Sequence, residues 1–300
     1  MKVLTIGAAV MDIVVARVLP MRGAKQDVAH IGLYAGGGAV NAGLNFAARG
    51  ARATVQACVG RDLEGGLLDG LLARHGVRPA FEASEDPTGK AVVMVDEQGA
   101  ARAYAQRGAS ARVGAQGFPG LADCDVAYVT GLSLESQEHL GAALSRKGAR
   151  GFRLVVTPGA RQLAHPEALR ILRREADLLC MNAYEAARLC GEDPPADAAG
   201  LSFEGAEALA RRVLAREGQG VLITLGEGGA LFHDGRAAHF GSARTVEVVS
   251  TVGAGDAFAS AFVHEWARGA DPARALSEAA DSAARVLGVL PANLAGALRE

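Results

Sequence analysis

Short apolar runs of β-type composition alternate with helical patterns along most of the chain, and this alternation limits the folds open to it. We predict strands at residues 3–7, 53–59, 126–130, 154–157, 178–181 and 221–225. Helical patterns cover residues 39–49, 63–75, 136–146, 166–173, 183–190, 203–217, 257–268 and 272–287. Strands that alternate with helices form βαβ units, and continuously apolar strands are covered on both faces. The sequence therefore predicts an α/β fold with a mostly parallel central sheet.

Two segments interrupt this alternation, at residues 12–35 and 87–107. Both look extended, and GKAVVMVDEQGAARAYAQ (89–106) has the pattern of a hairpin with its turn at 97–99. The alternatives are a static edge hairpin and a small β-lid that projects from the main domain. Long insertions outside the core of α/β enzymes often serve function, which favours the lid. We expect residues 1–300 to form a single domain that carries this lid.

Charge and cysteine usage exclude several classes of function. The chain has 31 basic and 33 acidic residues, which are well mixed and give a net charge of −2, so we expect no nucleic-acid partner. No apolar run reaches the roughly 20 residues that span a bilayer, so we expect no membrane partner. The four cysteines form no CxxC pair and lie in or beside apolar stretches, as buried thiols do in a reducing compartment. We therefore expect a cytoplasmic protein.

The stretch STVGAGDAFASAFV (250–263) leads from small residues to an aspartate at the start of a helical pattern. Glycines 253 and 255 let backbone N–H groups converge on one point, and the following helix adds its own free N–H groups. Together, Gly253, Ala254 and Gly255 form a pocket suited to phosphate or to a developing negative charge. Asp256 at its rim has two interpretations, as a general base beside that charge or as a helix N-cap behind a glycine turn.

Residues 34–77 hold a second candidate site, which begins YAGGGAVNAG. Gly37 and Gly38 precede a helical pattern with Asn41 on its first turn, and glycines permit a ligand to approach the backbone closely. The amide of Asn41 both donates and accepts hydrogen bonds, which suits sugar hydroxyls. Asp12, just after the first strand, can accept hydrogen bonds from two hydroxyls. The alternatives are a glycine turn with an exposed asparagine cap and an exposed loop acid.

Two further segments lie where strands are expected to end. In CMNAYEAARLCG (180–191), Asn182 and Glu185 are three residues apart at a strand-to-helix switch, where α/β sheets bind ligands. Glu185 could hold water on Mg²⁺, or the pair could form a capping box. In LITLGEGGALFHDG (222–235), Thr224 ends a strand, and Gly226 and Gly229 make either a turn that meets a nucleotide or a plain glycine hairpin. The sequence contains no Walker A, HExxH or GxSxG motif.

The order of these motifs resembles that of the ribokinase-like (PfkB) carbohydrate kinase family over essentially the whole chain. GGGAVNAGLNFAARGARATVQACVGRDLEGG is similar to the family's N-terminal signature, and STVGAGDAFASAFV to its C-terminal one. The resemblance implies a three-layer α/β/α sandwich with a β-lid that transfers the γ-phosphoryl group of ATP to a hydroxymethyl group. The resemblance also implies a role for each candidate residue. Asp256 is the catalytic base, and the amides of Gly253, Ala254 and Gly255 form the anion hole. The sugar site contains Asp12, Gly37, Gly38 and Asn41; the nucleotide and its phosphates contact Asn182, Thr224, Gly226 and Gly229; and Glu185 holds Mg²⁺ through water.

Three positions depart from the family pattern. Ser250 stands where the family usually has an aspartate, near the monovalent-cation site that members commonly build with a segment corresponding to residues 284–289. The resemblance therefore allows a bound K⁺, but the absence of a carboxylate at position 250 argues against it. Thr157 replaces a frequent aspartate in VVTPGARQ, close to the phosphate path, and Ser110 replaces a common asparagine near the base of the lid.

The sequence leaves three functions open for a protein with a small-molecule partner. These are a sugar kinase, a nucleoside kinase for adenosine or a modified nucleoside on the same fold, and a non-catalytic sugar- or nucleotide-binding regulator. The lid offers only Tyr34 and Tyr104 for stacking on a base, which favours a plain sugar. A phosphosugar would need basic residues near the lid, for which the chain offers Lys25, Lys90, Arg102 and Arg107. Because relatives with a lid often dimerise through it, we expect a homodimer.

Overall fold

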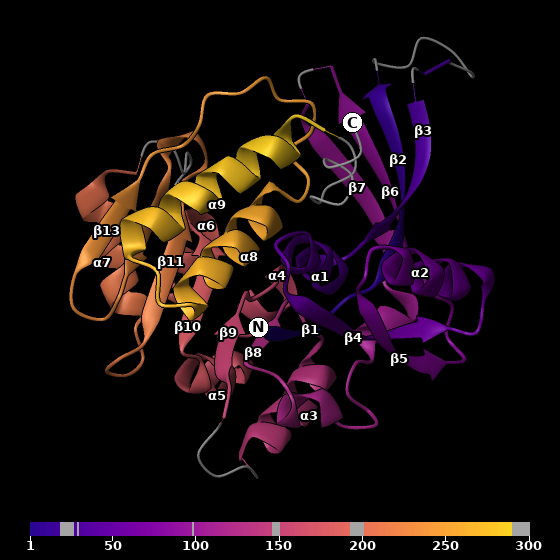
Figure 1. Cartoon of the computed structure of the whole chain (residues 1–300), viewed down its shortest axis with the longest axis horizontal. Coiled ribbons are helices and arrows are strands. Elements are labelled where there is room, and N and C mark those ends of the chain that lie inside the picture. Colours follow the sequence, from indigo (N-terminus) through magenta and orange to yellow (C-terminus); the bar gives the residue numbers. More distant parts are fainter. Residues whose placement is uncertain (19–26, 29, 98, 146–150, 193–200, 290–300) are drawn as a thin grey trace.

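The computed structural model describes residues 1–18, 27–28, 30–97, 99–145, 151–192 and 201–289, which contain one large and one small sheet (Figure 1). The large sheet is built from β1 (Lys2–Ile6), β4 (Arg52–Gly60), β5 (Arg78–Ser84), β8 (Val126–Val129), β9 (Arg153–Val156), β10 (Leu178–Asn182), β11 (Gly220–Thr224), β12 (Ala230–His233) and β13 (Ala238–Gly241). Their order is β13-β12-β11-β10-β9-β8-β1-β4-β5. The strands from β11 to β5 pair in parallel. At the other edge, β12 pairs antiparallel with β11, and β13 pairs antiparallel with β12.

Helices cover both faces of the large sheet. One layer consists of α1 (Gly38–Ala48), α2 (Leu63–Arg74), α8 (Ala254–Ala267) and α9 (Pro272–Leu287). The other consists of α3 (Leu134–Ser145), α4 (Ala160–Leu163), α5 (Pro166–Glu175), α6 (Ala183–Leu189) and α7 (Phe203–Val213). A separate cluster of buried apolar side chains fills the space between the sheet and each layer. The expected α/β sandwich with a mostly parallel central sheet is therefore confirmed.

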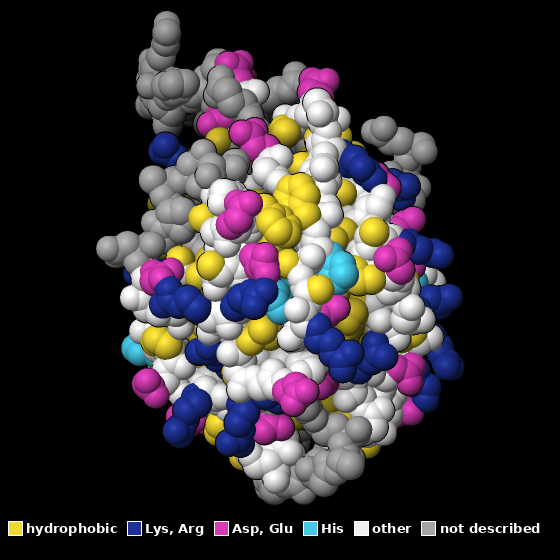
Figure 2. Space-filling view, turned by 90° about the vertical axis from the view of Figure 1, so that its left-hand side faces the viewer, with side chains coloured by type: hydrophobic (Ala, Val, Ile, Leu, Met, Phe, Trp, Pro, Cys, Tyr) yellow, Lys and Arg dark blue, Asp and Glu magenta, His cyan; other side chains and the backbone are white. Residues whose placement is uncertain are grey.

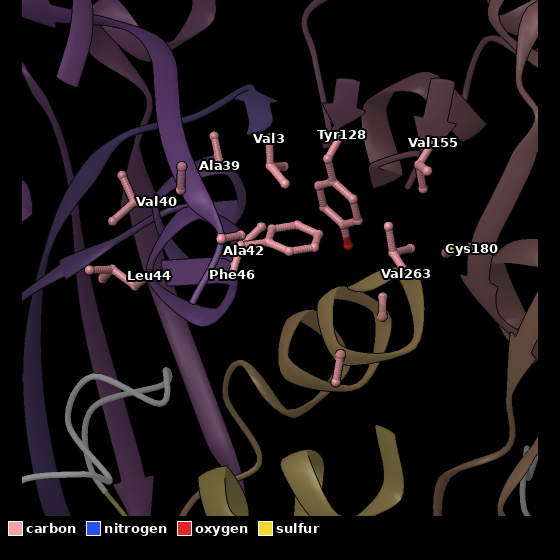
Figure 3. Packing of buried hydrophobic residues seen from close by; sticks show 14 of the residues in the cluster. Val3, Ala39, Val40, Ala42, Leu44, Phe46, Tyr128, Val155, Cys180 and Val263 are labelled. Atoms are coloured by element: carbon pink, nitrogen blue, oxygen red, sulfur yellow. The ribbon is translucent and has the colours of Figure 1, made fainter. Parts of the chain in front are cut away.

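The core beneath the first layer holds α1 and α8 against the same strand. Phe46 of α1 and Tyr128 of β8 are fully buried, and their rings meet edge to face with centroids 5.4 Å apart (Figure 3). Val263 of α8 belongs to the same apolar cluster. Aromatic pairs of this geometry stabilise a core beyond the area that they bury. The packing therefore fixes the relative positions of the two helices whose first turns carry Asn41 and Asp256.

The small sheet is built from β2 (Val10–Val18), β3 (His30–Gly36), β6 (Gly89–Asp96) and β7 (Ala101–Gln106), in the order β3-β2-β6-β7. These strands occupy the two segments expected to be extended, although residues 19–26 and 29 lie outside the described residues. One face, called the inner face below, packs Val14, Ala91, Val93 and Val95 together with Val252, which lies just before α8. The opposite, outer face exposes apolar side chains.

Residues 248–252 connect the small sheet to the first helical layer. The N–H of Thr251 donates to the carbonyl oxygen of Gly99, at the tip of the β6–β7 hairpin, with an N–O distance of 3.3 Å. Gly99 also lies against Val248. Together with Val252 on the inner face, these contacts attach the segment to two separate places on the small sheet.

The expected elements form with ends shifted by a few residues, and the largest correction concerns α7. The helical pattern runs to residue 217, but the helix ends at Val213. Leu214 turns into an extended conformation, and the side chain of Gln219 accepts the N–H of Ala215 at 2.8 Å while donating to the carbonyl oxygen of Ala176 at 2.8 Å. A tertiary contact therefore outweighs local helix propensity. Strands β5 and β13 were not predicted.

The surface agrees with the mixed charge of the sequence. On the face that carries α7 and β13, Lys and Arg side chains are interspersed with Asp and Glu (Figure 2). Within the described ranges, every helix is too short or too polar to cross a bilayer.

Candidate active site

Two adjoining cavities lie at the carboxyl ends of the parallel strands. The central cavity has a volume of about 350 Å³ and is lined by the predicted site residues Gly38, Asn182, Glu185, Gly253 and Asp256. The lateral cavity has a volume of about 590 Å³ and is lined by Gly226, Gly229 and Ala254. Thr224 and Gly255 line both cavities, so the two spaces meet at these residues. The carboxyl edge of an α/β sheet is where such folds bind ligands.

The start of α8 turns the backbone of 253–255 toward the central cavity. Gly253 is the N-cap residue in a left-handed conformation, with φ of 77°, which glycine adopts without steric strain. Ala254 and Gly255 are therefore the first residues of the helix, and their N–H groups have no partner within the helix. These N–H groups and the positive end of the helix dipole can stabilise an anion.

The side chain of Asp256 bonds to another element instead of capping α8. Its Oδ2 accepts a hydrogen bond from Nδ2 of Asn41 on α1 at 3.0 Å, across 215 positions of sequence. The helix makes no side-chain hydrogen bond at its N-cap, so the N-cap interpretation of Asp256 is wrong. The Oδ1 atom of Asn41 is buried and has no hydrogen-bond partner among the described residues, which leaves it available to accept one from a ligand hydroxyl.

Burial changes the acidity of both carboxyl groups of the central cavity. Desolvation raises the pKa of Asp256 to about 6, against the opposing effect of the hydrogen bond from Asn41. Desolvation also raises the pKa of Glu185, whose backbone hydrogen bond with Asn182 lowers it and whose proximity to the charge of Asp256 raises it again. Two acids near one cavity with pKa values shifted by burial are typical of functional sites.

Asn182 and Glu185 form a capping box and also line the central cavity. The N–H of Glu185 donates to Oδ1 of Asn182 at 2.8 Å, and the N–H of Asn182 donates to Oε2 of Glu185 at 2.9 Å. The capping interpretation is therefore correct. It does not remove the pair from the site, because both residues face the cavity, and the second carboxylate oxygen of Glu185 is left for other contacts.

Gly37 and Gly38 form a tight corner at the start of α1. Gly37 has φ of 92°, and a Cβ there would overlap the carbonyl oxygen of Ala8. The carbonyl oxygen of Gly37 accepts the N–H of Asn41 at 2.9 Å, so the corner sets the position of Asn41. Gly38 lies against the side chain of Thr130. The two glycines therefore allow α1 to begin close to the strand ends.

Asp12 lines neither cavity. It lies on the inner face of the small sheet, opposite Tyr34 in the strand register, with its carboxylate against Gly36. Burial raises its pKa to about 6. The structure therefore places Asp12 close to the glycine corner.

The lateral cavity brings together the glycine turn after β11 and the first two residues of α8. Gly229 has φ of 97° and packs closely against the carbonyl of Gly241. Sequence reasoning did not assign the rest of this wall, which consists of a loop, one further residue of α8 and one side of α9. Its apolar and small residues include Val246, Val248, Thr251, Phe258, Ala283 and Leu287. The alanines of α9 were the available signal, because small residues on one side of a helix leave room beside it.

The central cavity also contains residues that sequence reasoning passed over. Thr130 and Gly131 follow β8, and their position after a buried parallel strand was a usable signal. Cys180 and Tyr128 lie within strands and carried no such signal. Thr157, noted as a departure, lines the cavity, and its hydroxyl donates to the carbonyl oxygen of Val129 at 3.2 Å.

Comparison with known proteins agrees with this geometry. The family model described as pfkB family carbohydrate kinase matches residues 1–293. No curated protein sequence matches the chain.

Solved structures share the fold at low sequence identity. A ribokinase from Thermotoga maritima has a TM-score of 0.76 at 20% identity, covering 97% of this chain and 94% of its own. An adenosine kinase from Sinorhizobium meliloti has a TM-score of 0.78 at 21% identity, with coverages of 97% and 95%. A ribokinase from Cryptococcus neoformans in complex with ADP has a TM-score of 0.76 at 20% identity, with coverages of 97% and 94%. From the family match and this shared architecture, we conclude that the chain belongs to the pfkB family of carbohydrate kinases.

Proposed function

We propose that the protein transfers the γ-phosphoryl group of ATP to a hydroxymethyl group of a sugar or sugar-like molecule, with Asp256 as general base. The observation that carries this proposal is the position of Asp256 on the first turn of α8, beside the free N–H groups of Ala254 and Gly255 and bonded to Asn41. A base and an anion pocket at one helix start suit a reaction in which an alcohol loses a proton while charge grows on phosphate.

In the proposed reaction, Asp256 accepts the proton of the hydroxymethyl group as its oxygen forms a bond to the γ-phosphorus. The bond from that phosphorus to the β,γ-bridging oxygen breaks, and ADP leaves. The amides of Gly253, Ala254 and Gly255 stabilise the transferring group, since phosphoryl transfer depends mainly on positioning and charge stabilisation. Asn41 and Asp12 hold sugar hydroxyls, and Asn182, Thr224, Gly226 and Gly229 hold the nucleotide. The small sheet acts as a lid that excludes water.

Mg²⁺ fits the central cavity only as a metal carried mainly by the phosphates of ATP. The described residues contain no group of three or more His, Cys, Asp or Glu side chains able to hold a metal. Mg²⁺ at kinase sites keeps several waters and uses one or two carboxylates. Glu185, with one carboxylate oxygen free of the capping box, suits contact through water, and the bound metal would supply charge neutralisation of the phosphates.

The test is incubation of the protein with MgATP and a panel of pentoses, ketohexoses, sugar acids, sugar phosphates and nucleosides. We expect ADP and a phosphorylated product with at least one sugar. If none of the panel is phosphorylated, kinase activity is contradicted, and calorimetric binding of sugar and nucleotide without turnover would point to a regulator.

A nucleoside kinase is the second candidate, favoured by the aromatic ring of Tyr34 on the inner face. Its hydroxyl hydrogen-bonds with Nε2 of His30 at 2.6 Å, which limits the movement of the ring. Tyr104 pairs with Val92 on the outer face, so it does not offer a second ring to a base. Adenosine in the panel distinguishes this candidate from a plain sugar kinase.

We expect activity to be independent of K⁺. Ser250 is buried, and its hydroxyl accepts the N–H of Val252 at 3.2 Å. The carbonyl oxygen of Leu287 accepts the N–H groups of both Val249 and Ser250, at 2.7 and 3.2 Å. Carbonyl oxygens that coordinate K⁺ must point freely at the ion, so these residues do not fit a monovalent cation. Rates measured in KCl and in tetramethylammonium chloride of equal concentration should agree, and activation by K⁺ alone would overturn this expectation.

We expect a homodimer formed through the outer face of the small sheet. This face exposes Ile31 (65%), Leu33 (61%) and Tyr104 (69%), an apolar group that a second copy would cover. Light scattering coupled to gel filtration should give twice the chain mass of 30.7 kDa. Leu33→Glu should yield monomers, whereas Leu63→Glu, at an equally exposed leucine on the first turn of α2 (76%), should not. A monomeric wild-type protein would refute the interface.

A further inference from the structure

A third cavity begins at the end of the large sheet where the parallel strands start. It has a volume of about 780 Å³ and extends from the first residues of β1, β4 and β5 along one face of these strands. Its lining residues are all different from those of the central and lateral cavities. Small-molecule sites have volumes of about 300–1,000 Å³, so this space, called the amino-end cavity below, is large enough for a ligand of its own.

The floor of the amino-end cavity consists of alternate residues of β4 and β5. Thr54 pairs with Arg78 in the strand register. Residues two positions apart in one strand point to the same face, so Arg52 and Gln56 share the face of Thr54, and Glu82 shares that of Arg78. All five residues line the cavity. Because a strand rises about 3.3 Å per residue, the arginine and the glutamate on β5 are about 13 Å apart along the floor.

The opposite wall is the chain that leads into β8, and it is fixed at both ends. At one end, the carboxylate of Glu82 accepts the N–H of Gly114 at 2.9 Å and the N–H of Gln116 at 3.4 Å. At the other, a Cβ on Gly120 would lie 2.9 Å from the side chain of Leu4, so the backbone packs directly on β1. The walls of the cavity are therefore positioned by contacts that do not involve a ligand.

The inner end of the cavity offers hydrogen-bond acceptors. Gln56 is only 4% exposed, and its Nε2 donates to Oε1 of Glu82 at 3.2 Å and to the carbonyl oxygen of Gly117 at 2.7 Å. Both partners are acceptors, which fixes the orientation of the amide. Its Oε1 accepts no hydrogen bond from any described residue. Buried polar atoms normally have a partner, so this oxygen and the carboxylate of Glu82 suit hydroxyl or amino groups of a ligand.

The outer end of the cavity is basic. Nζ of Lys2 pairs with Oδ1 of Asp123 at 2.5 Å, and these two charges offset each other. The hydrogen bond from Lys2, and then the charges of Lys2, Arg52 and Arg78, lower the pKa of Asp123, so this acid stays ionised beside the lysine. Within the described ranges, the guanidinium groups of Arg52 and Arg78 form no ion pair. Two unpaired guanidinium groups at one end of a cavity suit a phosphate.

We propose that the amino-end cavity binds a phosphate monoester that carries hydroxyl or amino groups, of the size of a sugar phosphate or a nucleoside monophosphate. Its phosphate lies between Arg52 and Arg78, and its hydroxyl or amino groups donate to Gln56 and Glu82. The floor of about 13 Å between these ends is too long for free phosphate to contact both. The site goes beyond the proposed kinase reaction, because it holds a ligand in addition to the two substrates.

Isothermal titration calorimetry without ATP tests this site, with ribose 5-phosphate, AMP, inorganic phosphate and ribose as probes. We expect one of the two esters to bind at least about tenfold more tightly than inorganic phosphate or ribose, which each contact one end only. Arg52→Gln and Arg78→Gln should each raise the Kd of that ester about 10- to 100-fold, since each removes a charge-assisted hydrogen bond. The ester that binds more tightly shows whether the ligand is a sugar phosphate or a nucleotide.

Three further variants separate the site from a general effect of charge or folding. Thr54→Leu fills the floor between the two ends without changing the charge, and it should abolish binding of the ester. Arg74→Gln removes an exposed arginine in the last turn of α2 that does not line the cavity, and it should leave the Kd unchanged. Arg52→Lys retains the charge and should recover part of the affinity lost in Arg52→Gln. Melting temperatures of all variants verify that they are folded.

Each outcome supports or overturns the proposal without reference to kinase activity, because no ATP is present. The proposal fails if neither ester binds, or if inorganic phosphate binds as tightly as the esters and is an adventitious ion only. It also fails if binding survives both arginine-to-glutamine substitutions, since the ester then occupies another site, such as the candidate active site. If Thr54→Leu does not fold, the two arginine variants and Arg74→Gln decide the question.

Discussion

Replacing Asp256 with asparagine is expected to lower kcat by about 10²- to 10⁴-fold, because general-base catalysis contributes about that factor. The substituted amide keeps the shape of the side chain, and its oxygen can still accept the hydrogen bond that Asn41 donates at 3.0 Å. Binding should therefore persist while turnover is lost. Initial rates of ADP formation at saturating substrates, together with thermal-shift titrations of sugar and ATP, measure the two effects separately.

Stability provides an internal control for this variant. Desolvation disfavours the charged form of Asp256, so above pH 6 the folded state of the wild-type protein carries an unfavourable buried charge that asparagine lacks. Asp256→Asn should therefore melt at or above the wild-type temperature, which excludes unfolding as the cause of inactivity. Asp271→Asn, at the exposed N-cap of α9, is the matched substitution and should retain full activity. Wild-type turnover by Asp256→Asn would remove Asp256 from the mechanism.

The same group sets the expected pH dependence. A general base must be deprotonated, and the pKa of Asp256 is raised to about 6 by burial. In the wild-type protein, kcat should therefore fall as pH drops through about 6 and level off above it. An aspartate with an ordinary pKa would keep its activity down to about pH 4, so a profile flat between pH 5 and pH 7 would contradict this assignment.

The second large effect is expected from Gly37→Ala. The left-handed φ of 92° strains any side chain, and the added Cβ overlaps the carbonyl of Ala8, a backbone group that cannot move alone. We expect a loss of about 3 kcal/mol of unfolding free energy, from about 1–2 kcal/mol of backbone strain and about 1–3 kcal/mol of overpacking. Because the carbonyl of Gly37 accepts the N–H of Asn41 at 2.9 Å, the KM for sugar should rise at least about tenfold.

Denaturant unfolding and steady-state kinetics measure the two consequences of Gly37→Ala. Gly66→Ala is the control, since this glycine lies inside α2 with no atom within 4 Å of its would-be Cβ. That substitution should leave kinetics unchanged and stabilise the helix slightly, because alanine is the better helix former. If Gly37→Ala behaves like Gly66→Ala, the corner before α1 does not position the sugar site.

The sequence was sufficient for the parts of the fold that local pattern determines. The six parallel strands from β11 to β4 are mostly apolar and the main helices are periodic, so their positions were predicted to within a few residues. β5 and β13 carry polar residues at sheet edges and lack that signal. The end of α7 depends on Gln219, which reaches back to the carbonyl oxygen of Ala176, and no local pattern encodes such a contact.

The candidate site shows the same limit. The order of the motifs predicted that Asp256, Asn41 and Thr224 belong to one site. It did not predict the hydrogen bond between Asn41 and Asp256, which spans 215 positions and depends on how α1 and α8 pack.

Residues 248–252 couple the lateral cavity to the inner face of the small sheet. Val248 and Thr251 form part of the lateral wall, while Thr251 is tied to the hairpin tip at Gly99 and Val252 is packed into the inner face. If the lateral cavity holds the nucleotide, as proposed, a movement of the small sheet toward the acceptor would pull on the wall beside that nucleotide. If one ligand raises the affinity for the other by some factor, the second ligand must raise the affinity for the first by the same factor. The order of binding therefore does not change the stability of the ternary complex.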